Sequence, residues 1–180
     1  MLELDPALEV RPQVGRTISR INRDLRFSKD KTPYRSVVWL AFKRPSREWT
    51  EAPAFYFELS PEIYRFGMGF YSAGRDTMSR FRESLRARPE RFRSLVSPLG
   101  DDFAVEGERY RRPISGIDSL PEDLHHWYQR KNLYLEHREE AGGVLFTPAL
   151  VRQVSEGFAR LAPLYDFLWA LRSPSRSPSA

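Results

Sequence analysis

The sequence predicts an α+β protein, with a mainly antiparallel sheet of about four strands and helices packed on one face of that sheet. Two observations lead to this prediction. Residues 36–71 contain three short segments rich in aromatic and β-branched side chains, separated by turn signals, as in antiparallel strands. After residue 75, apolar residues recur every three or four positions, which is the period of a helix.

The four strands are expected in sequential order, near residues 17–27, 36–43, 54–60 and 63–71. Along 17–27, polar and apolar side chains alternate, as they do in a strand with one polar face. A helix remains the alternative for this segment, because Ile18, Ile21 and Leu25 would also share one helix face. Segment 36–42 is continuously apolar and bounded by prolines, which favours a buried strand.

Helices are predicted near residues 75–88, 89–99, 121–131 and 148–171. Pro89 is suited to the first turn of the second helix, and Gly100 to the position after its end. A small hairpin around Glu106 and Gly107 and a further strand at 132–139 are expected between these helices.

Two alternating glycines, Gly67 and Gly69, occur in the predicted strand 63–71. They do not form a phosphate-binding loop, because Ser72 occupies the position of the third glycine in that pattern. Instead they should leave one strand face bare, so that another backbone or a side chain such as Trp39 can approach closely.

Size and composition narrow the class of protein. The 180 residues fit a single domain at 1–171, followed by a low-complexity, disordered tail at 172–180. Without cysteine the chain has no disulfide, thiolate zinc site or cysteine nucleophile. Its three histidines lack metal-binding spacing, so no metal site is predicted.

No run of apolar residues is long enough to cross a membrane, and the first twenty residues lack the pattern of a signal peptide. We therefore expect a cytoplasmic protein without a membrane partner. The sequence indicates no cofactor and no oligomeric state.

The most densely charged stretch is RINRDLRFSKDKTPYR, residues 20–35. Between Arg16 and Arg35 there are seven basic and two acidic side chains, a net charge of +5 that equals the net charge of the whole chain. The positive excess is therefore local, and it indicates an anionic partner.

Three interpretations of this stretch remain open. Its arginines and lysines suit a phosphate or carboxylate ligand. In a catalytic cluster, Asp24 or Asp30 would serve as a general base beside the cations. In a structural network, the same aspartates would pair with neighbouring cations inside the fold and bind no ligand. The candidate ligand contacts are Arg20, Arg23, Arg26, Lys29, Lys31, Tyr34 and Arg35.

The sequence favours a protein that binds a phosphorylated or otherwise anionic small ligand through this stretch, with an enzymatic role left open. The alternative is a non-enzymatic nucleic-acid-binding module. It would use the same stretch together with a second basic cluster, Arg109, Arg111 and Arg112, which is interleaved with Tyr110.

The segment ISRINRDLRFSKDKTPYR, followed by an apolar strand, an aromatic strand ending in SPE, and GMGFY, resembles a family of uncharacterised proteins, the domain of unknown function 2461. The resemblance implies an α+β domain and no established activity. Members usually carry a helical segment ahead of the motif, whereas about fifteen residues precede it here. The resemblance therefore implies a version short at the N-terminus, with an exposed apolar patch.

Overall fold

The computed structural model describes residues 1–24, 26–27, 29, 31–46 and 51–172. In this part of the chain, five strands form one antiparallel sheet in the order β1-β2-β3-β5-β4. The strands are β1 (Val38–Phe42), β2 (Pro53–Leu59), β3 (Ile63–Phe70), β4 (Ala104–Glu106) and β5 (Tyr134–Glu140). The predicted α+β class is confirmed.

Three helices form an insertion between β3 and β5, and a fourth follows β5. They are α1 (Arg75–Ala87), α2 (Pro89–Val96), α3 (His125–Tyr128) and α4 (Ala149–Ala170). Short 3₁₀ turns occur at Ser97–Asp102, Ile117–Ser119, Glu122–Leu124 and Gly143–Phe146. None of the helices in the described chain is long and apolar enough to cross a membrane.

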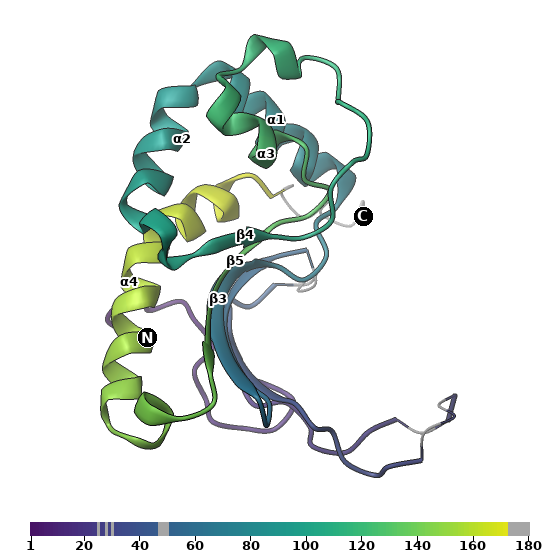
Figure 1. Ribbon diagram of the computed structural model, residues 1–180, viewed down its shortest axis with the longest axis vertical. Coiled ribbons are helices and arrows are strands. Elements are labelled where there is room, and N and C mark those ends of the chain that lie inside the picture. The colour runs from purple at the N-terminus through teal and green to yellow at the C-terminus, as the bar shows by residue number, and fades with distance from the viewer. Residues whose placement is uncertain (25, 28, 30, 47–50, 173–180) are drawn as a thin grey trace, which may run out of the picture.

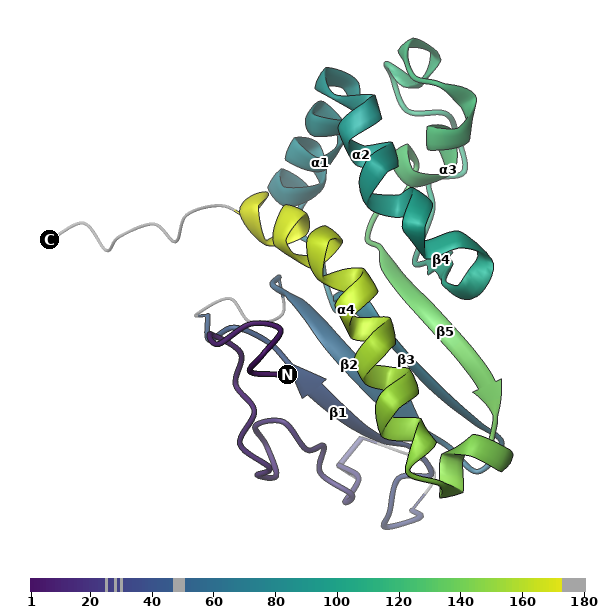
Figure 2. The same cartoon turned by 90° about the vertical axis from the view of Figure 1, so that its left-hand side faces the viewer.

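The sheet is curved, and α4 lies along its convex face (Figure 1). The helices of the insertion gather at one end of the sheet, and none of the labelled helices lies over the concave face (Figure 1). Figure 2 shows α4 crossing in front of β2 and β3, with the N-terminal segment beside β1. We call the concave face the open face.

Aromatic side chains hold α4 against the sheet. Phe158 lies with its ring centroid 5.1 Å from that of Phe55 and 6.0 Å from that of Phe66. Two helical turns further along α4, the Tyr165 ring stacks on that of Phe55, with a centroid distance of 4.6 Å. All four rings are at most 2% exposed, so each contributes roughly 1.5–3 kcal/mol through burial.

Arg44, just after β1, fastens the N-terminal segment to α4. Its guanidinium donates hydrogen bonds to Asp5 at 2.6 Å and to Asp166 at 2.7 Å. It also lies over the rings of Tyr165 and Trp169, 5.2 and 5.0 Å from their centroids. The N-terminal segment thereby packs at the β1 edge of the sheet.

The predicted strand at 17–27 is wrong as an element of the sheet. Only its first residues pair with the sheet, where Ile18 forms an isolated bridge with Leu40 of β1. Two of the alternating apolar side chains, Ile21 and Phe27, are 57% and 94% exposed, so they do not belong to the core. Beyond this point the chain leaves the sheet as an arm.

The other strands predicted near 36–43, 54–60, 63–71 and 132–139 are confirmed as β1, β2, β3 and β5. The helix predicted at 121–131 is shorter than expected. Its C-terminal residues instead pair with the segment after β4, where the Tyr110 N–H donates to the Gln129 carbonyl at 3.0 Å and Arg109 bridges Arg130. α3 accordingly ends at Tyr128.

A cluster of hydrogen bonds joins β3, β5 and α4 on the covered face. Glu139 accepts hydrogen bonds from the Tyr64 hydroxyl and the Gln153 amide, and lies 2.8 Å from Nε2 of His137. The bond from Tyr64, followed by that from His137, lowers the pKa of Glu139 below its ordinary value. The ionised carboxylate is therefore the form that the fold stabilises.

We expect Glu139→Gln to make stability less sensitive to acid. Because the pKa of Glu139 is lower in the folded state, its contribution is present above about pH 4.5 and is lost as the pH falls through the folded pKa. Melting temperatures measured from pH 7 to pH 3 should therefore fall less steeply for the variant than for the wild type. Identical slopes would contradict this role.

The glycines of β3 allow the close approach of β3 and β5. A Cβ atom on Gly67 would lie 1.8 Å from the Leu135 carbonyl oxygen and 3.0 Å from the Tyr56 hydroxyl. A Cβ on Gly69 would lie 2.3 Å from the Cα of Tyr134. The predicted close approach of another backbone is confirmed, since β5 supplies it. The nearest side chain at Gly67 is Tyr56 rather than Trp39.

We expect Gly67→Ala to lower the free energy of unfolding by about 1–3 kcal/mol, because a methyl group cannot fit against the β5 backbone without moving it. Gly142→Ala is the matched control, since it has extended backbone and no atom within 4 Å of its Cβ position. Urea denaturation measures both. Equal stability of the two variants would show that β3 and β5 can separate at little cost.

Candidate functional site

The open face contains a cavity of about 550 Å³ above β1, β2, β3 and β5. Aromatic rings from three strands form its walls, namely Trp39, Tyr56 and Tyr134, and small residues form much of its floor. Its volume is typical of pockets for small organic ligands. The complete lining is Trp39, Ala41, Lys43, Ala52, Ala54, Tyr56, Glu58, Arg65, Gly69, Phe70, Tyr71, Asn132 and Tyr134.

One arginine in the floor is shared by two carboxylates. Arg65 on β3 donates to Glu58 on β2 at 2.6 Å and to Glu136 on β5 at 2.8 Å. The strand registers place these three residues side by side, because Arg65 faces Glu58 and the neighbouring Gly67 faces Glu136. The group carries a net negative charge with both carboxylates ionised.

Tyr56 joins this group from the cavity side. Its hydroxyl donates to Glu136 at 3.2 Å, and the side chain of Glu136 is only 9% exposed. Burial, and then the negative charge of Glu136, raise the pKa of Tyr56 above its ordinary value. Tyr56 is therefore a neutral hydrogen-bond donor rather than a base.

The cationic side of the cavity lies at β1. Lys43, at the end of the cavity nearest the N-terminal segment, is half-buried, and burial lowers its pKa below the ordinary value. A second hollow, of about 520 Å³, shares Trp39, Ala41 and Lys43 with the cavity. Arg20 lines this second hollow, as do Glu9 and Arg16, which form an ion pair with each other at 3.1 Å. Arg20 and Lys43 are basic side chains at this β1 edge of the open face.

Residues 17–19, which lead into the charged stretch 20–35, are fixed to β1 by hydrogen bonds. The Ser19 N–H donates to the Trp39 carbonyl, and the Trp39 N–H donates to the Ser19 hydroxyl, both at 2.9 Å. The Ala41 N–H donates to the Thr17 carbonyl at 2.8 Å. Arg35, at the other end of the motif, lies over the Trp39 ring, 5.0 Å from its centroid.

The described residues between 20 and 35 form an arm that projects away from the sheet, as the dark trace at the lower right of Figure 1 shows. We call this segment the basic arm. Asn22 bridges Tyr34, and the Arg23 N–H donates to the Pro33 carbonyl at 3.0 Å. A third hollow, of about 610 Å³, is bordered by Arg20, Asn22, Arg23, Asp24, Arg26 and Arg35.

The structure brings five of the predicted site residues to this third hollow: Arg20, Arg23, Asp24, Arg26 and Arg35. The other described candidates, Lys29, Lys31 and Tyr34, are exposed on the arm and do not border it. Asp30 lies outside the described residues. Among the residues that are described, the charged side chains of the arm are exposed or, for Arg23, partly exposed, so this part of the motif is not an internal network.

Asp24 pairs with a neighbour on the arm. It accepts a hydrogen bond of 2.6 Å from Arg26, and its side chain is 55% exposed. The bond from Arg26 lowers the pKa of Asp24 below its ordinary value. A general base that works near neutral pH needs a raised pKa, so Asp24 is suited to orienting Arg26 rather than to accepting a proton.

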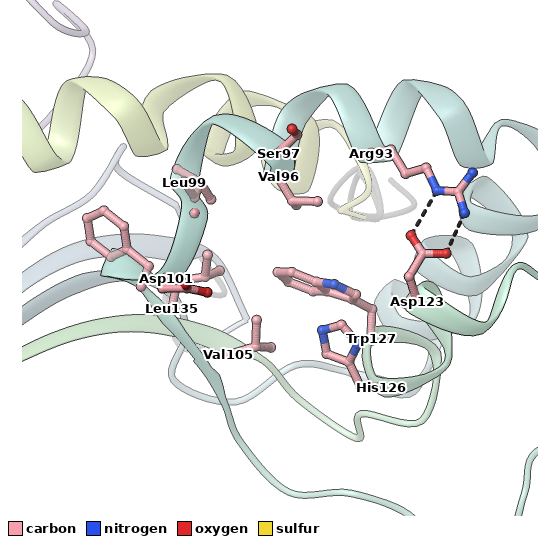
Figure 3. Close-up of a pocket in the computed structure, with 12 residues that line it drawn as sticks. Arg93, Val96, Ser97, Leu99, Asp101, Val105, Asp123, His126, Trp127 and Leu135 are labelled. Atoms are coloured by element: carbon pink, nitrogen blue, oxygen red, sulfur yellow. Dashed lines mark hydrogen bonds and ion pairs between the residues drawn. The ribbon is translucent and has the colours of Figure 1, made fainter.

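A separate hollow, of about 610 Å³, lies between α2 and α3 (Figure 3). Its rim carries the ion pair of Arg93 and Asp123, while Trp127 and His126 lie on the α3 side (Figure 3). Burial, and then the charge of Arg130, lower the pKa of His126. Asp101 also lines this hollow, and its carboxylate disfavours an anion there.

The second basic cluster, Arg109, Arg111 and Arg112, lies in the link between β4 and α3. Arg109 pairs with Arg130, which is 7% exposed and donates to the backbone carbonyls of Gly107 and Val105. This link and the basic arm lie at opposite ends of the open face (Figure 1).

Comparison with models of protein families matches residues 1–167 to the family described as "Conserved hypothetical protein (DUF2461)". The chain belongs to this family. A comparison with curated proteins gave no match. Because the DUF2461 description assigns no activity, the candidate site rests on the geometry of the described residues.

Several residues of the candidate site were missed by sequence reasoning, chiefly Lys43, Tyr56, Glu58, Arg65 and Glu136. A signal for some of them existed. Glu58 and Arg65 alternate with large apolar residues on β2 and β3, so they belong to the second face of those strands. Nothing local in the sequence indicated that Glu136 would lie beside them, since β5 is about seventy residues away in the chain.

We expect Arg65→Met to lower the free energy of unfolding by about 2 kcal/mol, because it leaves the buried Glu136 without its cation. Arg93→Met is the matched control. Arg93 also holds two carboxylates, Glu90 and Asp123, but these are 76% and 56% exposed, and exposed pairs contribute at most about 1 kcal/mol. Urea denaturation compares the variants, and an equal loss in both would contradict the role of Arg65.

Proposed function

We propose that this protein binds a phosphorylated or otherwise anionic small ligand on the surface that runs from the cavity of the open face to the basic arm. The observation that carries the proposal is the continuity of this surface. The cavity shares Trp39, Ala41 and Lys43 with the second hollow, which in turn shares Arg20 with the hollow of the arm.

The charges along this surface favour an anion. Arg20 and Arg35 are exposed beside Trp39, and guanidinium groups bind phosphate or carboxylate oxygens in pairs. Lys43 is half-buried, so its charge acts in a medium of lower dielectric constant than water. The further contacts proposed on the arm are Arg23, Arg26, Lys29, Lys31 and Tyr34.

An enzymatic step is not part of the proposal. The carboxylate nearest the arginines, Asp24, has a lowered pKa, and the phenol in the cavity, Tyr56, has a raised one. Neither pKa is shifted toward neutral pH, where a general acid or base exchanges its proton. Binding is therefore the function that these groups support.

A single-stranded nucleic acid is the second candidate ligand. Phe27 is 94% exposed and Tyr34 is 60% exposed, and both lie on the arm among basic residues. Exposed aromatic rings next to cations suit base stacking combined with phosphate contacts. The arm by itself would then be the binding element, without the cavity.

We expect Arg20→Gln and Arg35→Gln to weaken anion binding at least fivefold, with melting temperatures close to that of the wild type. Arg152→Gln is the matched control, because Arg152 is an exposed arginine on α4, on the opposite side of the sheet. The probes are inorganic phosphate, ribose 5-phosphate and a single-stranded oligonucleotide. A ligand at one hundred times its Kd should stabilise the fold by about 2.7 kcal/mol.

The salt dependence separates the two candidates. Binding of the oligonucleotide should weaken with a log–log slope of about 0.7 per phosphate that the arm contacts. A steep slope, with no stabilisation by ribose 5-phosphate, would favour the nucleic-acid function. If none of the three probes stabilises the protein, anion binding is refuted.

A further inference from the structure

The cavity of the open face has two chemically different ends, and this difference limits the ligand further. At the β1 end it is cationic, through Lys43 and the neighbouring Arg20. At the β2–β3–β5 end, Arg65 is shared by two carboxylates, so the net charge of that group is negative. A ligand that is anionic throughout would not suit the second end.

The negative end also offers an unused acceptor. Arg65 contacts Glu58 through Nε and Nη2, and both contacts go to Oε1 of the carboxylate. In the described chain, the other oxygen, Oε2, accepts no hydrogen bond, although Glu58 lines the cavity and its side chain is only 22% exposed. A half-buried carboxylate oxygen of this kind favours a ligand that carries N–H donors.

Two further polar groups line the cavity away from Glu58. On β3, the partner of Tyr134 is Gly69, which is four residues from Arg65, the partner of Glu58. Asn132 uses its Oδ1 to accept from the Glu108 N–H at 2.9 Å, which leaves its amide N–H groups as donors. The Tyr134 hydroxyl forms no hydrogen bond with any described residue. These groups add polar contacts along the cavity, while the acceptor for the edge of a polar ring is Glu58.

The walls favour a flat ring. Trp39 and Tyr134 stand on β1 and β5, and Tyr56 lies between them, edge to face with Tyr134 at a centroid distance of 6.3 Å. Between these rings the floor is made of Ala41, Ala54 and Gly69, which leave room for a planar group. Aromatic side chains of this kind stack on the faces of nucleobases.

We propose that the ligand is a nucleotide: an amino-bearing nucleobase lies in the cavity, with its N–H donors toward Glu58, and its phosphate lies at Lys43 and Arg20. This inference rests on the proposed anion-binding function and specifies its ligand class. A volume of about 550 Å³ accommodates a base and its sugar.

The experiment is isothermal titration calorimetry with AMP, UMP, ribose 5-phosphate and adenosine. We expect AMP to bind at least tenfold more tightly than ribose 5-phosphate and than adenosine, since each of these lacks one of the two contacts. UMP should bind more weakly than AMP, because its base has no exocyclic amino group to donate to Glu58.

Two variants test the placement of the base. Tyr134→Leu should weaken AMP binding at least fivefold and leave ribose 5-phosphate binding unchanged. Its matched control is Tyr110→Leu, since Tyr110 is 42% exposed in the link after β4 and does not line the cavity. Glu58→Gln provides a second variant in case Tyr134→Leu does not fold, and it should reduce the preference for AMP over ribose 5-phosphate.

The outcomes separate this inference from the proposed function. If ribose 5-phosphate binds as tightly as AMP, or if neither variant changes the preference, the nucleotide inference is refuted while anion binding stands. If adenosine binds as tightly as AMP, or if no phosphate compound binds, the proposed anion-binding function itself fails.

Discussion

The packing of one helix on one face of a curved sheet is the constraint on which the rest of this structure depends. Phe158 and Tyr165 of α4 lie against Phe55 of β2 at 5.1 and 4.6 Å, and all three are buried. These contacts bury the apolar side chains on one face of the central strands. The opposite side is left to water or to a ligand, so it can carry charged groups that a core would not tolerate.

The open face keeps its charges in place by pairing them. Arg65 is held by two carboxylates, and the more buried of these, Glu136, also accepts from Tyr56. This arrangement orders a carboxylate that has few exposed atoms, and it occupies the guanidinium group of the arginine. The cations of the β1 edge, Lys43 and Arg20, are not part of this group, so in the proposed complex this edge and the central strands would bind opposite ends of the ligand.

β1 connects the two halves of the candidate site. Its backbone pairs with the base of the arm through Ser19, while its side chains Trp39 and Lys43 belong to the cavity. A shift of the arm along β1 would change the position of Arg20 relative to Lys43. The hydrogen bonds at Ser19 and Thr17 fix this register and thus the spacing between the cationic groups and the aromatic walls.

The sequence by itself determined the fold class, the strands β1, β2, β3 and β5, and the local positive charge of residues 20–35. These are properties of short stretches, because the periods of strand and helix and the clustering of arginines are visible within a few residues. The local pattern also misled at 17–27, where alternation looked like a strand although Ile21 and Phe27 have no core to face.

Only the tertiary structure decided where the charges lie and which of them meet. The cavity combines β1, β2, β3 and β5, and the pairing of Arg65 with Glu136 joins residues about seventy positions apart. Such contacts depend on strand order and register, and a one-residue shift in register would turn Glu136 to the covered face. Whether the basic motif was an internal network or an exposed arm was undecided in the sequence for the same reason: burial is set by distant segments, not by neighbours in the chain.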